Sequence, residues 1–197
     1  MHRAVCQFIS EIFCEGRLGS HPDCAHQKIA LTPNAHRLIN KESGVVFVAV
    51  EHDGNIQQSD EEVDLVKAVY QELLGRPCTG SDGVTKPLAL EDYLIIAPYN
   101  AQVRALQAAL PGGARVGSVE KFQGQEAPIC ILSLCSSYGG YGSRGLAFIL
   151  DWNRVNVALS RAKCLAVVVA DPRIGGATAG TIDEMLLLNL SCKLAGA

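Results

Sequence analysis

Two blocks of the sequence join polar side chains to apolar, strand-like runs, as a phosphate-handling site in an α/β protein requires. The first block covers residues 117–126 and contains Gln123-Gly124-Gln125-Glu126, ahead of the apolar run 129–134. Ligands of parallel sheets gather at polar loops by the strand ends, where a glycine lets the backbone come close. This loop therefore has the character of a nucleotide-facing or phosphate-facing loop.

The second block, residues 154–163, carries two arginines and leads into the apolar run 164–170. On a helix, Arg154 and Arg161 lie two turns apart on one face, and the buried face consists of Val155, Ala158, Leu159 and Ala162. A rigidly held arginine beside a packed sheet can stabilise charge that develops on a transferring phosphoryl group. A lone arginine on such a helix would instead be an ordinary surface residue.

Both blocks resemble motifs of one helicase family. The pattern from Ser118 to Glu126 resembles motif V, and the run 154–162 resembles motif VI, of superfamily 1 helicases in the branch that includes the nonsense-mediated-decay helicase. Residues 97–103 are similar to the family's Pro-Tyr-x-x-Gln segment, and residues 1–18 to the lead-in to its second motor domain. The family usually has proline at the position of Arg3. The resemblance covers nearly the whole chain, but only the second of two RecA-like motor domains.

The resemblance implies a nucleotide-facing set of residues. Arg161 would be the arginine finger that reaches ATP bound on the partner domain, and Glu126 would hydrogen-bond the ribose. Gln123 and Gly124 would shape the loop between the two domains. Arg154 and Asn156 would brace motif V and motif VI against each other, and a contact from Arg154 to the nucleotide is a further expectation.

The resemblance also implies contacts with single-stranded DNA or RNA. Ser118 would touch the nucleic-acid backbone, and Tyr99 and Gln102 belong to the segment expected along the nucleic-acid track. Tyr99 at the end of a strand could stack on a base. The equal alternative is that Tyr99 packs the turn inside the domain.

The parts that hold phosphates and Mg²⁺ do not occur in this sequence. It contains no Gly-Lys pair, and therefore no Gly-x-x-x-x-Gly-Lys-Ser/Thr loop, and no acidic Mg²⁺ box follows a strand. In the family that the chain resembles, these parts lie on the first motor domain, so the resemblance implies that ATP and Mg²⁺ are held mainly by a first motor domain of the same protein. A free-standing RecA-like binding module without ATPase activity is the alternative, and a different α/β nucleotide-binding enzyme is a third hypothesis.

Apolar periodicity predicts the elements that position these residues. Helices are expected at 2–15, from the capping-box pattern at 59–62 onward, and at 101–110, 154–163 and 183–194; strands are expected at 45–50, 93–97, 129–134 and 164–170. Alternating strands and helices predict one α/β domain over residues 1–197, with three layers and a mostly parallel sheet of five or six strands. This agrees with the RecA-like, P-loop NTPase-like fold that the resemblance implies.

Three stretches lack such a pattern. Residues 19–43 are expected to be irregular and to lie along the surface, and residues 75–87 are expected to form a flexible loop. Residues 136–145 could form a nucleic-acid-facing loop or a glycine-rich hairpin without a binding role.

Composition limits the function classes. The chain has 197 residues, of which 48% are hydrophobic and 19% charged, so it can bury a full core. Its net charge of -3 excludes binding of nucleic acid by a basic face alone. No run approaches the ~20 apolar residues of a membrane helix, so we expect no membrane contact and a cytoplasmic location.

Metal and disulfide frameworks are not expected. The eight cysteines include no Cys-x-x-Cys pair, and Cys130, Cys135 and Cys164 lie in apolar runs that indicate burial as small hydrophobes. The His and Cys side chains of residues 21–26 have no second ligand pair to complete a tetrahedral site, so a polar surface loop is favoured. The acidic residues 60–62 fit the first turn of a helix, where its dipole favours negative charge.

Overall fold

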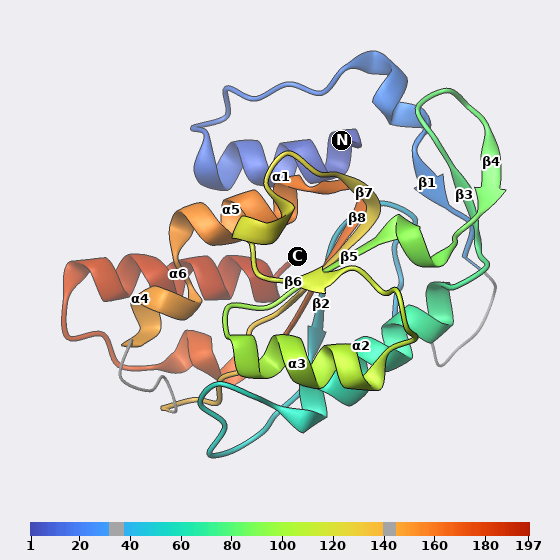
Figure 1. Ribbon diagram of the computed structural model, residues 1–197. Coiled ribbons are helices and arrows are strands. Elements are labelled where there is room, and N and C mark those ends of the chain that lie inside the picture. The colour runs from blue at the N-terminus through green and yellow to red at the C-terminus, as the bar shows by residue number, and fades with distance from the viewer. Residues whose placement is uncertain (32–37, 140–144) are drawn as a thin grey trace.

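A parallel sheet of five strands forms the centre of the computed structural model, which describes residues 1–31, 38–139 and 145–197 (Figure 1). Its strands are buried on both faces, as continuous apolar runs require. Their spatial order is β2 (Gly44–Ala49), β8 (Ala162–Ala170), β7 (Ala127–Ser133), β5 (Tyr93–Ile96) and β6 (Val116–Gly117). The predicted parallel sheet is confirmed.

Helices cover both faces of this sheet (Figure 1). One layer contains α1 (Arg3–Phe13), α4 (Gly145–Ile149), α5 (Trp152–Ser160) and α6 (Ile182–Ala195), and the other contains α2 (Asp60–Leu73) and α3 (Asn100–Ala109). Short 3₁₀ helices lie at Pro22–His26, Leu90–Asp92, Glu120–Phe122 and Pro172–Gly176. Each face of the sheet thus has its own apolar core, and the predicted three-layer α/β fold is confirmed.

A second, antiparallel sheet lies at the side of the domain, where a flexible loop was predicted. It has the order β1 (Lys28–Ile29), β3 (Pro77–Thr79) and β4 (Thr85–Pro87). The Thr79 and Thr85 hydroxyls lie 2.8 Å apart across the hairpin, and Gly83 takes a φ of +75° in its turn. The prediction for residues 75–87 was wrong because strands of three residues are too short to show periodicity.

The stretch 19–43 also differs from its prediction. It contributes β1 to the second sheet, and its Ile29 and Ile39 are fully buried. Residues 32–37 of this stretch, and residues 140–144 of the predicted glycine-rich loop, lie outside the described residues.

The start of α2 confirms one half of the predicted capping box. The Glu62 N–H donates to the Ser59 hydroxyl at 3.1 Å. The Ser59 N–H, however, donates to the Gln102 side chain at 2.9 Å, so Gln102 replaces the carboxylate that a capping box would use. The Glu62 side chain is therefore free to turn into the core.

Candidate nucleotide and nucleic-acid interface

Arg161 lies where α5 ends and β8 begins, at the amino edge of the main sheet. The predicted helix 154–163 is thus too long, because Ala162 and Lys163 already belong to β8. The Ala127 N–H of β7 donates to the Arg161 carbonyl at 3.1 Å, which fixes the backbone. The half-buried guanidinium donates through Nε to the Val157 carbonyl at 3.1 Å and through Nη2 to the Ser160 hydroxyl at 3.2 Å. Within the described residues Nη1 makes no hydrogen bond, so this nitrogen can donate to a ligand.

The loop before β7 places three further predicted residues at the same edge. Gln123, Gly124 and Glu126 are exposed. Gly124 has a φ of +74°, and a Cβ added there would meet open space, so the glycine serves the turn rather than a close packing contact. The Glu126 carboxylate lies 3.9 Å from Lys163 Nζ, a loose surface pair that leaves the carboxylate available. We call these three residues, with Arg161 and Lys163, the amino-edge surface.

A different group meets at the carboxyl edge of the sheet. A pocket of about 520 Å³ is lined by Gln57, Pro98, Tyr99, Asn100, Ala101, Arg104, Ser118, Glu120, Phe148 and Arg154; we call it the carboxyl-edge pocket. It combines two arginines, two aromatic rings and a half-buried hydroxyl, which are the groups that contact phosphates and bases in single-stranded nucleic acid.

Arg154 joins the two motif blocks at this pocket. Its Nη2 lies 3.2 Å from Glu120 Oε1, and its guanidinium lies 4.5 Å from the centroid of the Phe148 ring. The N–H of Glu120 itself, the Ser118 hydroxyl and Arg154 hold the pKa of Glu120 below its usual range. The bracing of one motif by the other thus has a defined contact in the structure. The predicted contact from Arg154 to the nucleotide stays a prediction.

Tyr99 and Gln102 are buried rather than displayed. The Tyr99 ring is 5% exposed and packs at 4.9 Å on Phe148, as the turn-packing alternative expects. Gln102 is fully buried, and its side-chain NH₂ donates to the Ser59 carbonyl at 3.2 Å and to the Ser133 hydroxyl at 2.9 Å. Phe148 and Ser118 are thus better placed than Gln102 to touch a ligand, and the nucleic-acid roles of Tyr99 and Gln102 stay predictions.

The structure therefore divides the predicted residues into two groups. The sequence was interpreted as one phosphate-handling site, but α5 runs from the carboxyl-edge pocket at Arg154 to the amino-edge surface at Arg161. The seven-residue step from Arg154 to Arg161 spans ~10 Å along the helix axis, so the two arginines lie at opposite edges of the sheet.

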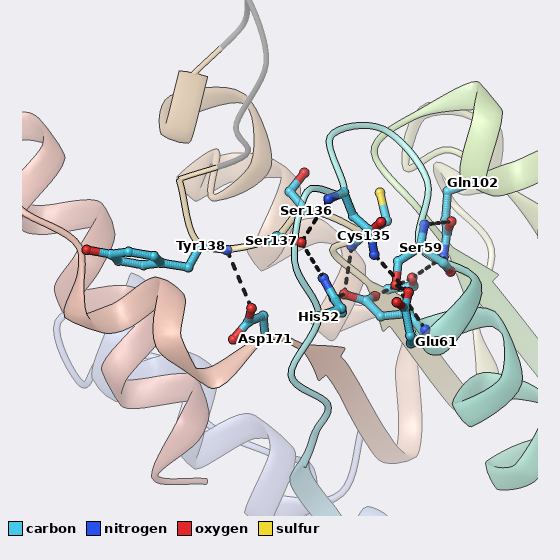
Figure 2. A network of polar contacts seen from close by, with 12 residues as sticks. His52, Ser59, Glu61, Gln102, Cys135, Ser136, Ser137, Tyr138 and Asp171 are labelled. Carbon is cyan, nitrogen blue, oxygen red and sulfur yellow. Dashed lines mark hydrogen bonds and ion pairs between the residues drawn. The ribbon is translucent and has the colours of Figure 1, made fainter.

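A buried polar network behind the carboxyl-edge pocket was not predicted from the sequence (Figure 2). Glu62 Oε2 accepts from the Ser133 hydroxyl at 2.6 Å, and Oε1 accepts from the Cys135 N–H at 3.0 Å. His52 lies between Glu62, 3.0 Å from Nε2, and the Ser137 hydroxyl, 2.8 Å from Nδ1. The prediction placed Glu62 in a capping box and in the helix dipole at the start of α2, whereas its carboxylate is fully buried.

Burial and pairing act in opposite directions on this pair. Burial raises the pKa of Glu62, against hydrogen bonds from His52, Ser133 and the Cys135 N–H. Burial alone would lower the pKa of His52, but the hydrogen bond and charge of Glu62 raise it overall above 6.5. The Ser137, His52 and Glu62 contacts resemble a hydrolytic triad, yet Ser137 is fully buried and no substrate can reach its hydroxyl. The network instead fixes residues 134–138 against the segment before α2.

The described residues show no group of three or more His, Cys, Asp or Glu side chains that could hold a metal ion. Residues 21–26 form the exposed 3₁₀ helix Pro22–His26, whose first turn is capped by the His21 ring. Among the parts of the chain that are described, no helix has the length and apolar character to span a bilayer.

Comparison with known proteins agrees with the fold and the motifs. The model of a family described as "AAA domain" matches residues 1–173. Similar proteins include the "Putative helicase MOV-10" of Gallus gallus, 27% identical over 88% of this chain and 20% of that protein. The "DNA-binding protein SMUBP-2" of Mesocricetus auratus is 28% identical over 88% of this chain and 17% of that protein.

A third relative is the "DNA replication ATP-dependent helicase/nuclease JHS1" of Arabidopsis thaliana, 27% identical over 72% of this chain and 10% of that protein. The chain thus spans about a tenth to a fifth of the length of these relatives. The matches confirm the resemblance to superfamily 1 helicases and support a helicase motor-domain role.

Proposed function

We propose that this chain, which belongs to the AAA domain family, is the second motor domain of an ATP-dependent superfamily 1 helicase. The observation that carries the proposal is the placement of α5. This helix presents Arg161 at the amino-edge surface and, through Arg154 and Glu120, contacts the carboxyl-edge pocket. The rigid helix α5 thereby connects the edge of the sheet that faces the nucleotide with the edge that faces the nucleic acid. Such a connection is required to couple ATP hydrolysis to movement along a nucleic-acid strand.

At the amino-edge surface, Arg161 is the arginine finger and Glu126 the ribose contact. The Arg161 side chain is oriented by the Val157 carbonyl and the Ser160 hydroxyl, which leaves Nη1 to donate to a phosphate oxygen. Such a donor stabilises charge that develops in the transition state of phosphoryl transfer. The Arg161 guanidinium suits the transferring phosphoryl group, and the Glu126 carboxylate suits the ribose. The phosphate cradle and the Mg²⁺ ligands come from a first motor domain, the partner of this one.

At the carboxyl-edge pocket, single-stranded DNA or RNA is the proposed ligand. Ser118 and Arg104 offer a hydroxyl and a guanidinium for phosphates, and Phe148 offers a half-buried ring for a base. Because the chain carries a net charge of -3, this contact is local and depends on the partner domain for the rest of the track.

ATP turnover by this chain alone, compared with turnover by the chain joined to its first motor domain, tests the proposal. The isolated chain is expected to hydrolyse no ATP, because an arginine finger without a phosphate-cradling loop leaves the nucleotide unheld. The joined protein is expected to hydrolyse ATP faster when single-stranded nucleic acid is present. Magnesium-dependent turnover by the isolated chain, in material free of contaminating ATPases, would overturn the assignment.

A further inference from the structure

The two arginines of the carboxyl-edge pocket differ in their partners. Arg104 of α3 is exposed, and within the described residues it forms no ion pair. Arg154 of α5 instead forms an ion pair with Glu120, in which Arg154 Nη2 lies 3.2 Å from Glu120 Oε1. Arg104 is therefore open to an anionic ligand, whereas the charge of Arg154 is already matched by a carboxylate of the same pocket.

Two contacts hold Arg154 at the pocket independently of Glu120. The Arg154 N–H donates to Asp151 Oδ1 at 2.8 Å, which anchors its backbone in the first turn of α5. The Arg154 guanidinium also lies 4.5 Å from the centroid of the Phe148 ring, within the range of a cation–π interaction. Because neither contact involves Glu120, the guanidinium remains directed to the pocket when the carboxylate is displaced.

The Glu120 carboxylate is free to leave this pair. The Glu120 side chain is 56% exposed and the Arg154 side chain 37% exposed, so water reaches both groups. An ion pair that is this exposed contributes little to stability. A nucleic-acid phosphate can accept two parallel hydrogen bonds from an arginine, as a carboxylate does. A phosphate that enters the pocket can therefore displace Glu120 from Arg154.

We propose that Glu120 masks Arg154 and that a phosphate of single-stranded DNA or RNA displaces the Glu120 carboxylate from the guanidinium. The inference rests on the proposed function, because it adds a control to the nucleic-acid contact of the same pocket. Contacts of neighbouring phosphates with Ser118 and Arg104 hold the strand at the pocket and so favour the displacement. Glu120 thus lowers the affinity of the pocket for a strand, and Arg154 is the residue through which it does so.

The test is the dissociation constant of the purified chain for fluorescein-labelled oligothymidylate and oligouridylate of about ten nucleotides, measured by fluorescence anisotropy at ~0.05 M salt. Glu120→Gln removes the charge and keeps the shape of the side chain. We expect it to lower the dissociation constant roughly two- to five-fold, which is the range of an exposed ion pair. The matched control is Glu91→Gln, which makes the same change in net charge at an exposed residue of the amino edge and should leave the dissociation constant unchanged.

A double-mutant cycle separates masking of Arg154 from a general repulsion between Glu120 and the strand. Arg154→Gln is made in the wild type and in Glu120→Gln. If Glu120 acts by masking Arg154, the gain from Glu120→Gln should disappear in the protein that lacks Arg154, because the carboxylate then has nothing to mask. Thermal melts followed by circular dichroism show whether each variant is folded.

Three results would contradict the proposal. One is a dissociation constant in Glu120→Gln no lower than in Glu91→Gln, and this comparison decides the matter even if Arg154→Gln fails to fold. Another is an equal gain from Glu120→Gln with and without Arg154. The last is no measurable binding of either oligonucleotide by Glu120→Gln. A gain with one oligonucleotide alone supports the proposal and identifies the sugar. The motor assignment is judged separately, by ATP turnover of the joined protein.

Discussion

Replacement of Glu62 by alanine is predicted to be the most destabilising single change in the buried network. The Glu62 carboxylate is fully buried and accepts hydrogen bonds from the Ser133 hydroxyl and the Cys135 N–H, and it pairs with His52. Alanine would leave these three groups buried without their acceptor. An unsatisfied buried group costs about 1–3 kcal/mol, and removal of one member of a buried ion pair costs about 3–5 kcal/mol.

We therefore expect Glu62→Ala to lower the free energy of unfolding by about 3–5 kcal/mol, or the melting temperature by roughly 10 °C. Urea denaturation followed by circular dichroism measures the difference. Asp64→Ala, an exposed change on the same helix, is the matched control and should cost less than about 0.5 kcal/mol. A loss in Glu62→Ala no larger than in Asp64→Ala would refute the view that this carboxylate holds the network together.

Three further outcomes are expected. The pKa of His52 is raised in the folded state, so its contribution to the free energy of unfolding is present below pH 6.5 and is lost as pH rises through the folded pKa. Urea denaturation between about pH 6 and pH 9 should show this loss in the wild type and little of it in His52→Gln. An equal dependence of the free energy of unfolding on pH in the two proteins would contradict the prediction. The isolated chain should bind ATP and single-stranded nucleic acid only weakly; micromolar or tighter binding by calorimetry at ~0.15 M salt would favour the free-standing binding module instead. In the joined motor, Glu126→Ala should chiefly raise KM for ATP, because a ribose contact exists before and during chemistry alike; a fall in kcat at constant KM would contradict the ribose role.

The strands of the main sheet could be predicted because each is a continuous apolar run. Residues 164–170, for example, fit a strand buried on both faces, and the structure buries all of them. The β3–β4 hairpin could not be predicted, because its strands have three residues each and its pairing partner, β1, is far away in the sequence. Short strands depend on tertiary contacts rather than on local pattern.

The sequence predicts candidate site residues but not their arrangement in space, and the roles of these residues stay predictions. The motif patterns single out Arg161, Glu126 and Arg154, yet they do not show that α5 returns across the sheet and places Arg154 at the opposite edge from Arg161. The buried role of Glu62 was hidden for a similar reason. An acid in the first turn of a helix is ordinarily exposed, and its true partners, His52 and Ser133, are brought to it only by the fold. The signal available in the sequence for this buried network was His52, a single histidine just after the strand 44–49.

Steady-state ATPase kinetics of Arg161→Ala, in the protein that joins this domain to its first motor domain, test the central claim most directly. Loss of a finger that acts on charge in the transition state should lower kcat roughly 10³-fold or more and leave KM for ATP and the fold little changed. Arg161→Lys should restore turnover only in part, because lysine lacks the planar fork that can contact two phosphate oxygens. Asp64→Ala should behave as wild type. A kcat in Arg161→Ala close to that of the wild type would contradict the claim.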